Sequence, residues 1–538
     1  MLIFWALSLQ IILNGQSNSY IQSALDKHSV LENPIQIEYV VTSSHTDHET
    51  GITHVYTRQV MNGQPIIGTE SSFHYDKKNN ENHAQINFKE QTQLQMTNEM
   101  AFMGELSTKD LLIKIAQHLE IPFHKLSIEI LNEDKNNRIA KARIKDIAYG
   151  DIPFRGILFF DKSGFLQYGY SVQIELKSSS DWWEILINAK SGEIIDKANY
   201  TISCTPTAFT NRSHLERKEF HDNKTLPLTK SAVILQDTHE CYLVFPYPLE
   251  SPYHGPQSLV TNPADTTASP FGWHDTNGAA GPEYTITRGN NVWAKEDQNG
   301  DNESTIGFSP DGGDSLVFNN PIHLNNAPST YEAGAVTNLF YWNNLVHDVM
   351  HYYGFDEASG NFQETNYSGD GAGSDFVYAD AQDDGNCNAN FSTPPDGSNP
   401  RMQMYTCNQS NPSHDSDLDN GVVVHEYGHG ISNRLTGGSG NSFCLSNTEQ
   451  MGEGWSDYFA MVFTMKPGDM GADKRGMGNY LVGDPINGDG IRPFPYSIDF
   501  NINPQTYDHV KSVSVPHGVG SVWCSMLWEM TWGLIDKY

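Results

Sequence analysis

The chain has 538 residues, enough for two to four domains and more than one hydrophobic core. Its 65 acidic and 33 basic residues give a formal charge of −32, which argues against nucleic acid and anionic membrane surfaces as partners. Six cysteines are too few for a disulfide scaffold in a chain of this length. The composition fits a soluble exported protein.

The first predicted element is an apolar run over residues 3–13, which is too short to span a bilayer. Polar residues 14–17 follow it. This pattern predicts a signal peptide over residues 1–17 and therefore export from the cell. No other segment approaches the length of a membrane span, so we expect no membrane association.

Residues 18–205 contain most of the lysines and several alternating runs. Residues 52–60 predict the first strand of a hairpin, with Asn62 and Gly63 as its turn. Ser107 begins an amphipathic helix, and residues 182–198 predict two strands around a Lys-Ser-Gly turn. We therefore expect an α+β module here, without a catalytic constellation of its own.

Residues 206–240 are polar and show little periodicity, which predicts a linker. From residue 241 onward the chain is rich in glycine, asparagine, aspartate and aromatic residues, and helices are predicted late. Residues 297–303 group carboxylate and amide side chains around a glycine, which makes calcium a possible ligand. The glycine comes too early for an EF-hand loop, so a solvated acidic loop is the simpler interpretation.

Two histidines four residues apart, His347 and His351, lie in an aromatic stretch that predicts a buried helix ended by Gly354. The acidic residue between them, Asp348, is a short base, and no second pair of carboxylates follows closely. We interpret both histidines as core or boundary residues.

Cys387 and Cys407 flank a Pro-Pro-Asp-Gly turn at residues 394–397, between two strand-like runs. We therefore expect a disulfide between them, since export permits such bridges. The other four cysteines cannot be paired from the sequence.

A second histidine pair, His425 and His429, has Glu426 directly after its first member. On an α-helix the two imidazoles share one face and can both bind one zinc ion. Glu426 is turned about 100° around that helix. It can therefore contact a metal-bound water and act as its general base without being a ligand.

The third zinc ligand is expected from residues 449–459. Glu453 and Asp457 are four apart and share a helical face. Glu453 can complete a two-histidine, one-carboxylate set, and Asp457 can accept the free ring N–H of one histidine. The metzincin pattern is excluded because Ser432 and Leu435 occupy positions that it requires for glycine and histidine. A solvated acidic helix face is the ordinary alternative.

These motifs resemble the fungalysin family of secreted zinc metallopeptidases, which are related to thermolysin. The early hairpin and residues 182–198 look like propeptide modules of that family. The other blocks that carry the resemblance are residues 272–278, 286–292, 393–397, 400–404, 425–435 and 451–457.

The resemblance implies an α+β fold in which an α+β propeptide precedes a thermolysin-like, two-lobed catalytic domain. A β-rich lobe comes before the zinc helix and a helical lobe after it, with the site between. The helical lobe is expected to be truncated, because family chains continue past the position of Tyr538. The implied domains are a signal peptide (1–17), a propeptide (18–205), a linker with the maturation site (206–240) and the catalytic domain (241–538).

Three further roles follow from the resemblance. The imidazole of His517 would stabilise the developing oxyanion, and Arg492 would bind a substrate carbonyl. Asn388 and Ala389 would belong to an edge strand that pairs with an extended peptide. A loop histidine, a surface or core arginine and a plain hairpin arm are the ordinary alternatives.

The sequence thus predicts a monomeric, secreted, zinc-dependent endopeptidase that acts on extracellular proteins and peptides. Its propeptide would serve as an intramolecular chaperone and inhibitor. One alternative is a zinc aminopeptidase, which would not cleave a blocked internal peptide. The other is a catalytically silent protein that uses zinc only for its fold, although structural zinc sites are usually closed by four protein ligands.

Overall fold

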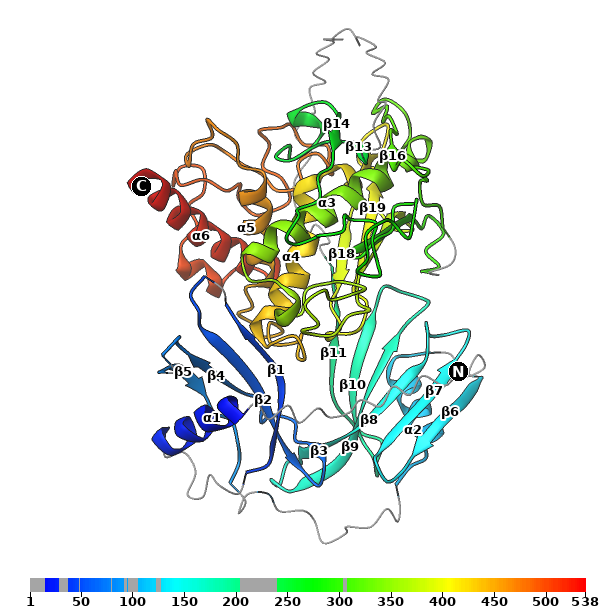
Figure 1. Cartoon of the computed structure of the whole chain (residues 1–538), viewed down its shortest axis with the longest axis vertical. Helices are drawn as coiled ribbons and strands as arrows, with labels where there is room; N and C mark the ends of the chain where they lie inside the picture. The colour runs from blue at the N-terminus through cyan, green and yellow to red at the C-terminus, as the bar shows by residue number, and fades with distance from the viewer. Residues whose placement is uncertain are drawn as a thin grey trace.

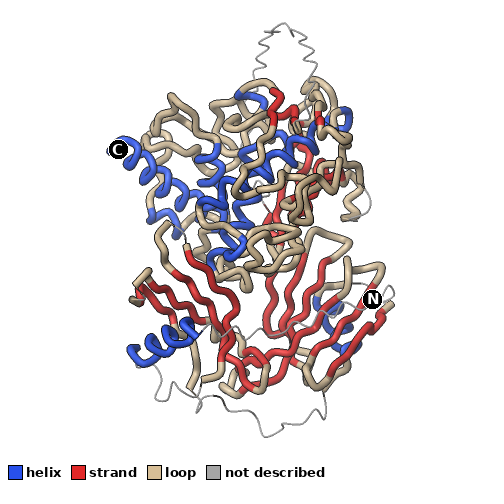
Figure 2. Tube along the Cα trace, in the orientation of Figure 1, coloured by secondary structure: helices blue, strands red, loops and turns tan. Residues whose placement is uncertain are grey.

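The computed structural model describes residues 15–28, 37–47, 49–78, 80–90, 94, 105–121, 127–203, 240–302 and 307–538. We call the described residues up to 203 the N-terminal region and those from 240 the C-terminal region. Figure 1 shows the N-terminal region in blue and cyan beneath the C-terminal region, and Figure 2 shows that strands dominate the former. Of the predicted signal peptide only residues 15–17, and of the predicted linker only residue 240, lie within the described residues, and Cys204 lies outside them.

A first antiparallel sheet opens the N-terminal region. Its elements are α1 (Gly15–His28), β1 (Tyr39–Thr46), β2 (Thr53–Met61), β3 (Gln64–Pro65), β4 (Ser71–Tyr75) and β5 (Glu81–Gln85). The strand order is β1-β2-β4-β5, with β3 paired to β2. Asn62 and Gly63 both have positive φ and form the turn of the predicted hairpin, which is confirmed. Apolar residues of α1, among them Ile21 and Leu25, cover one face of this sheet through Val55 and Phe73.

The second sheet of the N-terminal region has six strands in the order β11-β10-β9-β8-β7-β6. Its elements are α2 (Thr108–His118), β6 (Ile128–Asp134), β7 (Ile139–Ile144), β8 (Ile152–Phe160), β9 (Leu166–Glu175), β10 (Trp182–Asn188) and β11 (Ile194–Asn199). The Ser107 side chain accepts a hydrogen bond from the backbone N–H of Asp110, so the predicted helix start is confirmed. Leu112 and Ile115 of α2 pack into the core of this sheet. The two strands predicted over residues 182–198 are also confirmed, as β10 and β11.

The C-terminal region is built on a mixed sheet of order β12-β18-β19-β17-β15, with β20 paired to β19; the edge strand β12 is contributed by the N-terminal region. A three-stranded sheet of order β14-β13-β16 lies beside it. The strands are β12 (Thr201–Ser203), β13 (Cys241–Val244), β14 (Ser258–Thr261), β15 (Val292–Glu296), β16 (Val317–Phe318), β17 (Val377–Asp383), β18 (Ala389–Ser392), β19 (Arg401–Cys407) and β20 (His414–Asp415). The α-helices are α3 (Glu332–Tyr352), α4 (Asn420–Thr436), α5 (Gly452–Phe463) and α6 (His517–Lys537).

The order of these elements agrees with the expected α+β class. The strands of the described C-terminal region precede α4, and the helices α5 and α6 follow it. The 21-residue helix α3 lies among the strands and passes through the core, with Phe340, Trp342 and Val346 fully buried. Among the described helices, none has the length and hydropathy needed to cross a bilayer.

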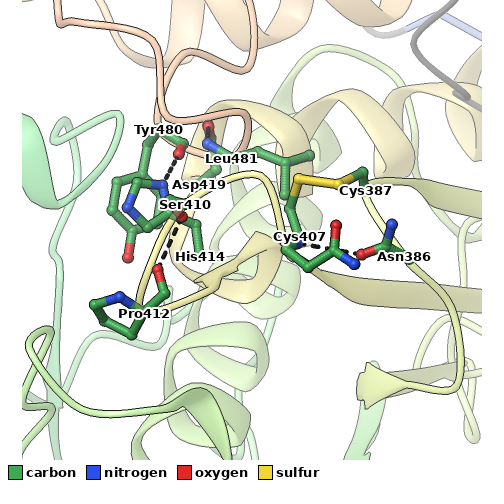
Figure 3. The surroundings of a disulfide bond; sticks show 10 residues. Asn386, Cys387, Cys407, Ser410, Pro412, His414, Asp419, Tyr480 and Leu481 are labelled. Atoms are coloured by element: carbon green, nitrogen blue, oxygen red, sulfur yellow. Dashed lines mark hydrogen bonds between the residues drawn. A yellow bond between two sulfur atoms is a disulfide. The ribbon is translucent and has the colours of Figure 1, made fainter. Parts of the chain in front are cut away.

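The expected disulfide joins Cys387 to Cys407 (Figure 3). Cys387 comes just before β18 and Cys407 ends β19, so the bridge closes the open end of this hairpin. The backbone N–H of Cys387 also donates to the carbonyl of Thr406 at 2.9 Å. Both contacts hold β18 at its place next to β19.

His347 is fully buried in α3 and contacts Asn361, in agreement with its interpretation as a core histidine. Its neighbour Asp348 is a buried hydrogen-bond acceptor. The Asp348 carboxylate accepts bonds from the backbone N–H of Asp265, the hydroxyl of Ser269 and the indole N–H of Trp273, at 2.7–2.9 Å. It therefore ties residues 265–273 to α3.

We predict that Asp348→Ala lowers the free energy of unfolding by about 3 kcal/mol, because several buried donors lose their acceptor. Urea unfolding followed by tryptophan fluorescence measures this change. The exposed Asp370 provides the control, since Asp370→Ala is expected to stay within about 0.5 kcal/mol of the parent. Equal stability of the two variants would contradict the anchoring role of Asp348.

Candidate active site

The helix α4 carries both histidines of the second pair on one face. Its N-terminus is capped by Asp419, whose side chain accepts a bond from the backbone N–H of Val422. The Nε2 atoms of His425 and His429 are 3.1 Å apart, and both rings are buried. The spacing of four residues thus directs two imidazole nitrogens to one point.

The helix α5 brings Glu453 to the same point. Its carboxylate oxygens lie 3.4 Å from His425 Nε2 and 3.7 Å from His429 Nε2. Ligands at zinc bonding distance in a tetrahedral site are separated by about 3.3 Å. The three side chains therefore fit a zinc ion, and they form one of two groups of converging metal-binding side chains among the described residues.

Glycines allow the helices to approach this closely. A Cβ on Gly428 of α4 would lie 2.9 Å from the Cα of Ser456 in α5. A Cβ on Gly454 of α5 would lie 2.4 Å from the carbonyl oxygen of Gly520 in α6. Any larger residue at these contacts would separate the helices. The positions of the ligands therefore depend on residues that have no side chain.

Asp457 lies one turn after Glu453 on α5 and contacts the far side of the His425 ring. Asp457 Oδ1 is 2.7 Å from His425 Nδ1, which leaves Nε2 facing the converging ligands. Burial opposes a charge on Asp457, but Arg492 and His425 outweigh it and hold the pKa of this carboxyl well below its usual range. Asp457 is therefore an anionic partner that fixes the orientation of the ring.

Arg492 is buried and donates to two carboxylates of the site. Its guanidinium contacts Asp457 at 2.7 and 2.8 Å and Glu453 at 3.1 Å. Through these hydrogen bonds the arginine orients the two acidic residues. Its expected contact with a substrate carbonyl stays a prediction. The Tyr496 hydroxyl also donates to Asp457. Tyr496 belongs to no motif, so the sequence offered no signal for it.

Glu426 and His517 lie around the three candidate ligands. Glu426 is fully buried on α4, next to His425 in the chain. His517 is the first residue of α6, and its Nε2 lies 3.3 Å from Glu453 Oε1. Burial lowers the pKa of His517, which favours a neutral ring with one N–H at neutral pH. The structure thus brings His517 to the three expected metal ligands, and Glu426 directly follows one of them on α4.

The strand expected to bind substrate already has a partner. The strand β18 pairs in antiparallel fashion with β12, which ends the described N-terminal region. The side chain of Asn388 donates to the Ser203 hydroxyl at 2.7 Å, and Ala389 begins β18. Residues 199–203 also line a cavity of about 250 Å³ together with Pro516, the neighbour of His517. The end of the N-terminal region therefore covers the expected substrate edge beside the site.

The acidic loop expected as a possible calcium site is arranged differently. Asp297 converges with Asp380 and Asp383 of β17 rather than with the other acidic residues of its own loop. Lys295 and Arg401 both pair with Asp380, so two cationic side chains already neutralise part of this cluster. Residue 303 of the expected loop lies outside the described residues.

Two histidines and a glutamate around one point, with a second glutamate beside them, are typical of zinc metallopeptidases. A family model described as Fungalysin metallopeptidase (M36) matches residues 241–538, and one described as Fungalysin/Thermolysin Propeptide Motif matches residues 37–81. The chain therefore belongs to the fungalysin metallopeptidase family.

Curated relatives carry related names. The chain is 42% identical over 301 residues to Extracellular metalloproteinase 1 of Phaeosphaeria nodorum and 42% identical over 303 residues to Extracellular metalloproteinase 2 of Trichophyton rubrum. Both matches cover 55% of this chain and 47% of the relative, so the chain spans about half the length of the relatives it matches. A solved structure, the Bacillus megaterium YpeB C-terminal domain, covers 34% of this chain at 9% identity with a TM-score of 0.18, which supports no conclusion.

We predict that Gly454→Ala weakens metal retention and lowers the free energy of unfolding by about 1–3 kcal/mol, because the new methyl group pushes α5 away from α6. Metal analysis after dialysis and urea unfolding measure the two effects. Gly533 in α6 is a matched control, since a Cβ there meets nothing within 4 Å. Gly533→Ala is expected to retain metal and to be at least as stable as the parent. Full metal retention in Gly454→Ala would contradict the proposed constraint.

Proposed function

We propose that this chain is the proenzyme of a secreted, zinc-dependent endopeptidase that hydrolyses extracellular proteins and peptides. The observation that carries the proposal is the convergence of His425, His429 and Glu453 beside Glu426. We further propose a signal peptide over 1–17, a propeptide over 18–205, a linker with the maturation site over 206–240 and a catalytic domain over 241–538. The propeptide-motif match to residues 37–81 supports the second part, and the metallopeptidase match to residues 241–538 supports the fourth.

In this proposal His425, His429 and Glu453 hold zinc, which when bound supplies an activated water and polarises the scissile carbonyl. Glu426 accepts the proton of the attacking water and delivers it to the leaving amine nitrogen. The products are a new carboxyl end and a new amino end.

His517 would donate its ring N–H to the carbonyl oxygen as negative charge develops there. The neutral state favoured by its lowered pKa leaves one ring N–H available for this hydrogen bond. Asp457 would act through His425 by holding that ring in place, and Arg492 and Tyr496 would act through Asp457. We therefore assign positioning roles to these three residues.

The pairing of β12 with β18 supports inhibition by the propeptide. A substrate bound by strand addition along β18 needs the backbone groups of Asn390–Ser392 that β12 now covers, and the Asn388 side chain is bonded to Ser203. Substrate binding and propeptide docking would therefore exclude each other. The N-terminal region would also serve as a folding template, because it contacts the C-terminal region along β18.

We expect Glu426→Gln to retain zinc and to lower the rate of hydrolysis by on the order of 10³-fold, because the general base is lost. Glu453→Gln is instead expected to lose zinc on dialysis, because it removes a ligand. Mass spectrometry of products from mixed protein substrates, with and without a chelator, gives the rate, the metal requirement and the cleaved bonds.

The exposed Glu449 supplies a matched control, since Glu449→Gln should keep both zinc and activity. Products cut at internal bonds, lost on chelation, would support the endopeptidase. Release of single N-terminal residues would favour an aminopeptidase instead. Undiminished hydrolysis by Glu426→Gln would overturn the assignment of the base.

For the propeptide, we expect Ile202→Pro to raise the initial activity of the uncleaved chain several-fold. Ile202 is the middle residue of β12, and proline is poorly tolerated in a paired strand. Hydrolysis of a short peptide, measured before any maturation, tests this. Ile202→Val preserves the strand and should behave as the parent. Equal activity of the proline and valine variants would exclude inhibition through β12.

A further inference from the structure

Four histidines form one row across the first sheet of the N-terminal region. His45 of β1 lies opposite His54 of β2, His54 lies opposite His74 of β4, and His74 lies opposite His83 of β5. Successive rings lie 4.9, 4.9 and 5.9 Å apart, and the Nδ1 atoms of His54 and His74 are separated by 2.7 Å. We call these four residues the histidine row.

The histidine row lies on the face of the sheet that meets the C-terminal region. Along β2, Val55 points into the core under α1, so His54 and Tyr56 project from the opposite face. The Tyr56 hydroxyl donates to the carbonyl of Leu435 at the end of α4, at 3.2 Å. A Cβ on Gly438 would lie 2.6 Å from the Tyr56 ring, so the two surfaces are in close contact. This face of the sheet is therefore docked against the region that carries the candidate zinc site.

The first histidine of the row lies at this contact. The Nδ1 atom of His45 is buried and has no hydrogen-bond partner within the described part of the chain. Asp47 flanks it, and Asp356 faces it from the C-terminal region, with Glu357 and His351 nearby. Further along the same face lie the ion pair of Arg58 with Glu70, and the weakly acidic groups of Tyr56 and Cys444.

The row disfavours protonation in the docked state. Burial and the neighbouring His54 lower the pKa of His45 from 6.5 to about 4, although Asp356 and Asp47 act in the opposite direction. Burial and three other histidines lower the pKa of His74 from 6.5 to about 4. Burial also lowers the pKa of His54. His45, His54 and His74 each take up a proton more readily once this burial is removed.

We propose that the histidine row makes the docking of the propeptide pH-sensitive, so that acidification weakens the contact between the first sheet and the catalytic domain. Adjacent imidazolium ions would repel one another at 4.9 Å, and the carboxylates of Asp47 and Asp356, which act on His45, are too few to balance four positive charges. The docked state is fully favoured above the ordinary pKa of histidine. It loses stability as the pH falls from 6.5 toward 4.

A metal-binding role for the row has less support. Of the described residues, only two groups of three side chains bring their ligand atoms close together, and neither contains a histidine of the row. The rings stack across the strands rather than around a common centre. Proton uptake therefore fits this geometry better than metal coordination.

The test is amide hydrogen exchange of the full chain at about pH 7.5 and about pH 5, corrected for the intrinsic exchange rate. The Glu426→Gln background prevents the self-cleavage expected from the proposed function. We expect the protection of β1, β2 and residues 435–440 to fall at least tenfold at the lower pH. If each pKa returned fully from about 4 to 6.5 on separation, the response would reach at most about 30-fold for each of His45 and His74.

The matched variant replaces His45, His54 and His74 by glutamine together. Its amide protection in the same segments should change less than threefold between the two pH values. His118→Gln, at an exposed end of α2, should respond as the parent does. If the triple variant does not fold, His74→Gln alone should remove about half of the logarithmic response. The proposal would be overturned if the amide protection of the parent did not change with pH. It would also be overturned if the triple variant showed the same pH response as the parent. The assignment of the first sheet to a propeptide rests on the proposed proenzyme function. The exchange measurement needs no catalysis, so the pH response and the proposed function can fail independently.

Discussion

The close packing of α4, α5 and α6 is the constraint on which the candidate site depends. A helix can direct residues four apart to one side, but three side chains from two helices meet only if the helix axes are near each other. Gly428, Gly454 and Gly520 permit this approach, because each has backbone or Cβ atoms of a neighbouring helix where a side chain would begin. The chemistry of His425, His429 and Glu453 therefore rests on residues that take no part in it.

The same packing creates an electrostatic problem that a metal ion would solve. Glu426, Glu453 and Asp457 are buried, and Arg492 is the buried guanidinium that contacts two of them. Histidines that bind a metal are neutral, and three carboxylates against one guanidinium then leave two negative charges for the ion to balance. Burying such charges is costly unless they are paired. A divalent cation balances them and uses the imidazole nitrogens as well, so the charge of the site and its ligand geometry favour the same occupant.

Local spacing explains which features could be predicted from the sequence. The pairs His425 with His429 and Glu453 with Asp457 depend only on helical periodicity, and the Asn62-Gly63 turn and the Ser107 cap depend on a few neighbouring residues. Tyr496, Asp380 and Asp383 could not be predicted, because their contacts depend on how distant segments pack. The histidine row depends on the register of four strands, and a shift of one residue in any strand would turn its histidine to the other face.

Two of the contacts between the N-terminal and C-terminal regions, those of β12 and of the first sheet, differ in their consequences for release of the N-terminal region. The strand β12 has three residues and covers β18, whereas the first sheet docks through Tyr56 at the end of α4, near Leu435. Cleavage of the chain after β12 would leave the contacts of both surfaces intact. It would remove only the covalent link that keeps the N-terminal region at a high local concentration. A three-residue strand is too short to stay bound without the sheet surface beside it. In the proposed proenzyme, weakening the sheet contact would therefore also favour exposure of the edge of β18. This would connect a row of histidines in the proposed propeptide to the proposed substrate edge.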